Sequence, residues 1–126
     1  GVWMPDDLNV PTSLEQVPPL WGFRLRRPVD ELVLDHVFQG WSGKALVEWP
    51  EAGHALEISA DELYRHLVVY TPPGQPFFCV EAVSMIGDGV NKLEAGVQGT
   101  GVHILAPGES MRGSMYFRPV PPKPTA

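Results

Sequence analysis

The chain has 126 residues, which is enough for one domain and too few for two of ordinary size. Its 14 prolines and 13 glycines follow no three-residue period, which excludes collagen, and an apolar fraction of 44% argues against global disorder. The formal net charge is −6, and the only basic cluster is Arg24, Arg26 and Arg27, so no nucleic-acid partner is expected. No apolar run is long enough to span a membrane, so no membrane partner is expected either.

Cysteine and histidine give two further limits. A single cysteine, Cys79, leaves no internal disulfide and indicates a reducing compartment, so we expect a cytoplasmic location. The spacing of this cysteine and the four histidines resembles no zinc site, and no nucleotide-binding fingerprint is present. We therefore expect neither a metal ion nor a cofactor.

Frequent glycine and proline predict short strands joined by turns. Residues 1–19 are rich in turn residues and are predicted to be an extended lead-in segment, and residues 119–126, with four prolines, an extended tail. Between them the pattern predicts strands over residues 31–38, 44–49, 54–59, 64–70, 77–83, 99–106 and 110–118. The fold class is therefore all-β with antiparallel strands, in one domain over residues 1–126.

Residues 60–67 admit a second interpretation. Ser59 and Glu62 have the spacing of a capping box, and Leu63 and Leu67 lie four residues apart, as on one face of a helix. The strand interpretation is preferred because the residues that follow, up to Tyr70, are β-branched and aromatic.

Glu81 is the first candidate for chemistry, because it interrupts the apolar run over residues 77–83. A carboxylate among apolar neighbours is poorly hydrated in its charged form, so its pKa rises, and this makes a general base that works near neutral pH. The alternative is a glutamate on the solvent face of an edge strand.

Two other polar groups interrupt apolar or turn sequence. Asp35 and His36 form a polar pair inside a predicted strand, which needs hydrogen-bond partners and indicates either a structural hydrogen bond or a sugar contact. Asp88 and Asn91 flank glycine, which is typical of a tight turn and also of a polar ligand site. Aromatic faces pack against sugar rings or fill cores, and the chain is rich in tryptophan: Trp3, Trp21, Trp41 and Trp49.

Seven stretches together resemble the C-terminal part of the aldose 1-epimerases, also called galactose mutarotases. In chain order they are VPTSLEQVP, FRLRRPV, LDHVFQGW, HLVVYTPPG, FCVEAVS, IGDGVNK and LAPGES. Each stretch is weak alone, but their order and spacing cover nearly the whole chain. The resemblance implies a large antiparallel β-sandwich, the galactose mutarotase-like supersandwich, of which this chain is a C-terminal part.

The resemblance also implies a reaction. The family's general base lies in the segment that matches FCVEAVS, at Glu81. Glu81 would take the proton from the anomeric hydroxyl of an aldose while a histidine acid protonates the ring oxygen, so that the ring opens and recloses as the other anomer. The expected pocket residues are Asp35, Asp88, Asn91 and Arg24, and the expected ligand is a small-molecule sugar, with no metal or cofactor.

This sequence departs from the family at several positions, and two of these departures bear on the mechanism. The family's histidine acid and second substrate-binding histidine lie upstream of every matched stretch, and the family's substrate-binding aspartate is matched by Arg24. We therefore expect an N-terminal half or a second chain to complete the sandwich and supply the acid. The alternatives are a non-catalytic carbohydrate-binding β-sandwich, for which arginine would suit acidic or phosphorylated sugars, and a structural β-domain whose pattern is coincidental.

Overall fold

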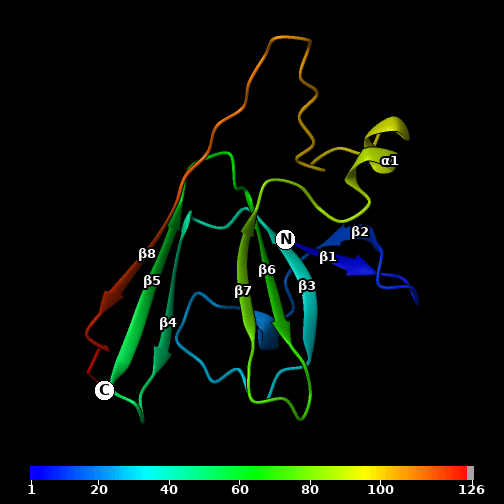
Figure 1. Cartoon of the computed structure of the whole chain (residues 1–126). Helices are drawn as coiled ribbons and strands as arrows, with labels where there is room; N and C mark the ends of the chain where they lie inside the picture. The colour runs from blue at the N-terminus through cyan, green and yellow to red at the C-terminus, as the bar shows by residue number, and fades with distance from the viewer. Residues whose placement is uncertain (125–126) are drawn as a thin grey trace.

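The structure is a computed structural model and describes residues 1–124. In this part of the chain eight strands form two antiparallel sheets (Figure 1), which confirms the all-β prediction. The larger sheet has the order β2-β1-β3-β6-β7, with β1 (Val2–Pro5), β2 (Pro11–Glu15), β3 (Leu34–Gln39), β6 (His66–Thr71) and β7 (Cys79–Val83). The smaller sheet has the order β4-β5-β8, with β4 (Lys44–Trp49), β5 (His54–Ala60) and β8 (Met115–Val120).

The hairpin of β4 and β5 shows how the residues of a turn determine where the flanking strands end. Their register runs from Lys44 opposite Ser59 to Trp49 opposite His54. The connecting turn closes at Gly53, whose φ of 67° is the left-handed conformation that glycine adopts without a steric penalty. Strand β4 begins and ends where the sequence predicts, and β5 is one residue longer than predicted.

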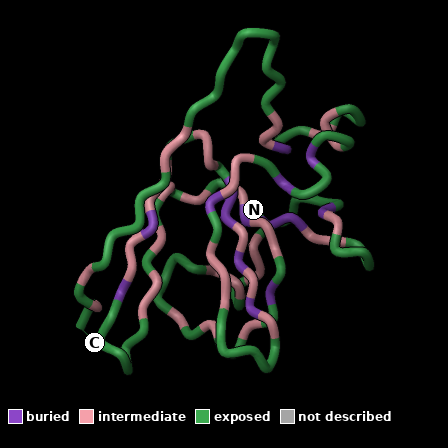
Figure 2. Tube along the Cα trace, in the orientation of Figure 1, coloured by how far each residue is buried: buried purple, intermediate pink, exposed green. Residues whose placement is uncertain are grey.

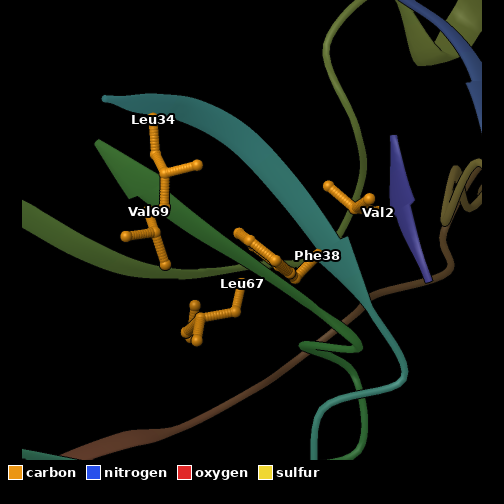
Figure 3. Close-up of a cluster of buried hydrophobic side chains, with 6 residues drawn as sticks. Val2, Leu34, Phe38, Leu67 and Val69 are labelled. Atoms are coloured by element: carbon orange, nitrogen blue, oxygen red, sulfur yellow. The ribbon is translucent and has the colours of Figure 1, made fainter. Parts of the chain in front are cut away.

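The hydrophobic core lies on one face of the larger sheet. Val2, Phe38, Leu67 and Ala82 stand opposite one another across four strands, and all four are buried. Together with Leu34 and Val69 they form the cluster drawn in Figure 3, and Figure 2 shows the buried positions concentrated on these strands. Partly buried side chains pack against the cluster, among them Trp21, Trp41, Ala60 and Tyr64. Trp21 and Trp41 therefore pack on this cluster, and a third tryptophan, Trp3, is 2% exposed.

Several segments differ from the prediction. The lead-in segment is a hairpin, β1 and β2, that joins the larger sheet, and it is followed by a short 3-10 helix, η1 (Pro19–Trp21). Residues 60–67 contain no helix, which agrees with the preferred strand interpretation, although β6 begins at His66 and not at residue 64. The extended tail is partly strand, because β8 continues to Val120, and its last two residues lie outside the described part.

The largest difference between the predicted and the observed structure lies in the connection between β7 and β8. It contains a helix that the sequence pattern missed, α1 (Gly89–Glu94), and no strand over residues 99–106. Gly99 and Gly101 have φ of 78° and 77°, outside the range of a strand, so the apolar residues that follow do not join a sheet. In Figure 1 this connection arches from α1 over the two sheets to β8.

The outer strands leave apolar groups uncovered. β7 and β2 are the outer strands of the larger sheet, and β4 and β8 those of the smaller sheet. On β8, Phe117 and Met115 are exposed, although their partners Ile58 and Ala60 on β5 are buried or half-buried. Within residues 1–124, nothing covers this side of β8.

Candidate active site

Glu81 lies in the middle of β7, on the outermost strand of the larger sheet. Its side chain is exposed, and no hydrogen bond or ion pair to its carboxylate is found within residues 1–124. The apolar surroundings expected from the sequence are therefore absent from the described residues, and the alternative position on the accessible face of an edge strand is the one observed. The reason is topological: β7 pairs only with β6, so the local apolar run does not place Glu81 in the core.

The strand register places other polar groups on the face of Glu81. Side chains directly opposite each other in an antiparallel sheet point to the same face, and so do residues two apart on one strand. This defines three parallel rows across the sheet, each read here from β3 towards β7. The first row is Asp35, Tyr70 and Cys79; the middle row is Val37, Val68 and Glu81, with Trp3 of β1 opposite Val37; and the third row is Gln39, His66 and Val83.

Asp35 shares this face with Glu81. It is exposed, and its carboxylate accepts a hydrogen bond of 2.6 Å from the side-chain amide of Asn9, in the turn between β1 and β2. Asp35 and Glu81 lie on strands that are two positions apart in the sheet, and they are offset by two residues along the strands. This geometry gives about 12 Å between their Cα atoms. Both carboxylates therefore stand on one face, at a separation that a bound ring with extended hydroxyl groups can bridge.

The third row ends in a buried histidine. His66 is 2% exposed, and its Nε2 lies 3.0 Å from the carbonyl oxygen of Gly99, so Nε2 carries the proton and donates. Its Nδ1 is buried and has no partner within the described residues. Beside it, Gln39 accepts a hydrogen bond of 2.9 Å from the indole nitrogen of Trp3. His66 is not among the residues singled out from the sequence, because no local signal in the sequence places it on the face of Glu81.

Two glycines hold the connection after α1 against this row. A Cβ at Gly99 would lie 3.0 Å from the Gln39 amide. At Gly101, whose φ is 77°, a Cβ would lie 2.1 Å from the Ser84 carbonyl oxygen and 2.8 Å from the His66 ring. The chain at residues 99–101 therefore packs directly on the ends of β6 and β7.

A cavity of about 390 Å³ lies at this end of the face. Its lining includes Gln39, Trp41, Arg65, His66, Gly101 and His103, and we call it the His66 cavity. Its volume falls in the range of about 300–1,000 Å³ typical of small-molecule sites. The cavity adjoins the row of Glu81, because His66 and Glu81 are diagonal neighbours on adjacent strands.

Asp88 and Asn91 form a cluster of their own at α1. Asp88 stands before the first turn with φ of 56°, and its carboxylate accepts a hydrogen bond of 2.5 Å from the Asn91 side chain. Lys92 lies 3.4 Å from the same carboxylate. No contact between this cluster and Asp35 or Glu81 is found in the described residues, so the structure does not bring the two pairs together.

Arg24 is likewise separate from Glu81. It is exposed in the segment between η1 and β3, and its neighbour Phe23 packs edge-on against Phe38, on the core face of the sheet. His36 points to the same core face, with its ring centroid 4.6 Å from that of Trp21. Burial lowers the pKa of His36 below its usual value of 6.5, and the nearby Asp35 opposes this in part. The segment that carries Arg24 thus covers the side of the sheet opposite Glu81.

Residues 1–124 contain no cluster of three or more metal-ligating side chains and no helix long and apolar enough to cross a bilayer.

The described residues thus form two antiparallel sheets, with Asp35 and Glu81 on one face of the larger sheet. The family model described as aldose 1-epimerase matches residues 3–118. The chain belongs to the aldose 1-epimerase family.

A protein and a solved structure, both from Escherichia coli K12, are similar to it. It is 30% identical to the uncharacterised protein YphB, over 82% of this chain and 37% of YphB. It also superposes on the crystal structure of a candidate aldose 1-epimerase with a TM-score of 0.78 and 24% identity, over 96% of this chain and 43% of that protein. The second likeness shows the fold alone. The chain spans about two fifths of the length of each protein.

Proposed function

We propose that this chain is part of an isomerase that interconverts the α and β anomers of an aldose, with Glu81 as general base. The observation that carries the proposal is the position of Glu81: an accessible carboxylate on the open face of the sheet, with Asp35 on the same face, in a chain of the aldose 1-epimerase family.

The reaction needs only proton transfers. Glu81 accepts the proton of the anomeric hydroxyl while an acid donates a proton to the ring oxygen, so the bond between C1 and the ring oxygen breaks and an aldehyde forms. Rotation about the C1–C2 bond and the reverse transfers close the ring as the other anomer. Concerted acid and base avoid a full charge on either oxygen, which is the usual advantage of paired proton transfer. Asp35 would hold a hydroxyl group elsewhere on the sugar.

The general acid that protonates the ring oxygen is not supplied by the sheet face that carries Glu81. The imidazole nearest to Glu81 in the register is His66, and its Nε2 is occupied by the Gly99 carbonyl. We propose that the remaining strands of the sandwich, in an N-terminal half or a second chain, supply the acid. The free side of β7, the exposed Phe117 on β8 and the two-fifths coverage of the relatives support this.

Two measurements test the proposal. Polarimetry on fresh α-glucose or α-galactose, with the chain and whatever completes it, should show that Glu81→Gln lowers the rate by about 100- to 10,000-fold, the usual range for a general base. Glu51→Gln, in the exposed turn after β4, is the matched control and should leave the rate unchanged. An unchanged rate in Glu81→Gln would remove this residue from the mechanism.

The mass of the native particle should exceed 13.9 kDa, and a monomer of that mass that is fully active would contradict the need for a completing part.

A second function, sugar binding without catalysis, is favoured by the absence of an accessible imidazole next to Glu81 in the register. Sugar binding that persists in Glu81→Gln, together with no anomer interconversion in the wild-type assembly, would establish it. Asp88, Asn91 and Arg24 remain predicted pocket residues.

A further inference from the structure

We propose that the His66 cavity binds an anionic substituent, a phosphate or a carboxylate, of the sugar whose anomeric hydroxyl lies at Glu81. The substrate class is then an acidic aldose derivative. This inference rests on the proposed function, because it takes the carboxylate of Glu81 as the reacting end of the site.

The charge of the lining is the first argument. The chain as a whole has a net charge of −6, but no aspartate or glutamate lines this cavity. Its one formally charged side chain is Arg65, and His66 and His103 line it as well. A lining whose only formal charge is positive, in an acidic chain, favours an anion over a cation.

The balance of donors and acceptors is the second argument. The Oε1 atom of Gln39 already accepts from Trp3, so Gln39 offers its two amide hydrogens. Arg65 offers only donors, and the indole nitrogen of Trp41 already donates to the Tyr64 carbonyl at 2.6 Å. A neutral sugar hydroxyl needs both a donor and an acceptor, whereas a phosphate or carboxylate oxygen needs donors alone. The free groups of Gln39 and Arg65 therefore suit an anion, since the one unpartnered acceptor, Nδ1 of His66, is buried, and the Trp41 ring offers an apolar surface to the carbon atoms next to it.

Arg65 is available to a ligand at little cost. Its side chain is 70% exposed and is paired at 3.5 Å with Glu62, which is 94% exposed. An exposed pair of this kind contributes little stability, so an anion in the cavity can replace Glu62. The planar guanidinium can then bind two oxygens of one phosphate or carboxylate.

The position of the cavity links it to Glu81. His66 and Glu81 point to the same face from adjacent strands, in a diagonal pair whose Cα atoms lie about 7–8 Å apart. The wall is rigid, because the His66–Gly99 hydrogen bond and the close packing of Gly101 fix it. A sugar with one end at Glu81 can therefore reach the His66 cavity, where Arg65 is the one formal charge, with its other end.

Calorimetric titration of the chain together with whatever completes it, as in the polarimetry above, tests the inference with four probes: glucose 6-phosphate, galacturonate, glucose and inorganic phosphate. We expect the anionic sugars to bind at least about tenfold more tightly than glucose. Arg65→Met should remove this preference by weakening the binding of the anionic sugars. The control is Arg112→Met, an exposed arginine in the connection before β8, which should change neither. Tighter binding of glucose 6-phosphate than of galacturonate assigns the group as phosphate, and the reverse order assigns it as carboxylate.

Three results would overturn the inference: equal binding of charged and neutral sugars, an unchanged preference in Arg65→Met, or inorganic phosphate binding as tightly as the sugar phosphate. Polarimetry separates this from the proposed function. If anomer interconversion depends on Glu81 but the sugars show no preference for anions, the inference about the cavity is wrong and the proposed reaction stands. Anion preference that depends on Arg65 without interconversion defeats the proposed reaction and leaves the cavity as a binding site.

Discussion

Replacing Gly101 with alanine should strongly destabilise the chain. Two costs combine at this position. The φ of 77° places a non-glycine residue in the left-handed region, at about 1–2 kcal/mol. The new methyl group would lie 2.1 Å from the Ser84 carbonyl oxygen and 2.8 Å from the His66 ring, an overlap that backbone shifts relieve at about 1–3 kcal/mol. The sum is about 2–5 kcal/mol, or roughly 8–20 °C in Tm at about 4 °C per kcal/mol.

The matched control is Gly96→Ala. Gly96 has nearly the same φ, 78°, but a Cβ there would meet nothing within 4 Å. This variant should therefore carry the backbone cost alone, and urea denaturation at equal m-values gives the difference between the two variants. Equal destabilisation by the two substitutions would refute the claim that residues 99–101 pack tightly on the ends of β6 and β7.

Two further predictions concern the other face of the larger sheet and its link to β4. Because burial against Trp21 lowers the pKa of His36 in the folded state, the unfolded chain binds the proton first as pH falls. The free energy of unfolding should thus fall as pH drops from above 6.5 to below it, and urea titrations at several pH values should show a smaller fall in His36→Asn; the same fall in both proteins would exclude His36 as the cause. Arg26 pairs at 2.8 Å with Glu48, whose side chain is only 8% exposed, so Arg26→Met should leave a nearly buried carboxylate with the backbone amide of Lys123 as its one remaining partner within residues 1–124 and cost about 1–3 kcal/mol. Arg65→Met, which removes an exposed pair, should cost less than about 1 kcal/mol, and equal costs in the two variants would contradict this reasoning.

Local pattern was a good guide where turn residues bound a strand. Strand β4 was predicted with its observed bounds because Gly43 and Pro50 flank it. The pattern failed over residues 99–106, where valine and isoleucine indicate a strand but Gly99 and Gly101 turn the backbone out of the extended range. Helix α1 was missed because glycines at its start are more typical of a turn.

The candidate site depends on register, which the sequence does not reveal. Placing Asp35 and Glu81 on one face requires the pairing of β3 with β6 and of β6 with β7. The same pairing puts His66 beside Glu81, although no spacing in the sequence connects them. Glu81 was singled out by its apolar neighbours, yet the topology leaves its strand at the edge of the sheet, where local composition does not decide burial. The cytoplasmic location remains a prediction.

Because β7 is the outermost strand of its sheet, the specific activity should depend on the protein concentration. Along one side of this strand, the backbone amide and carbonyl groups have no neighbouring strand within residues 1–124. If the strand that pairs there belongs to a separate polypeptide, docking that polypeptide fixes the backbone next to Glu81. Specific activity would then decrease on dilution, by mass action, and would recover when the complementary polypeptide is added in excess.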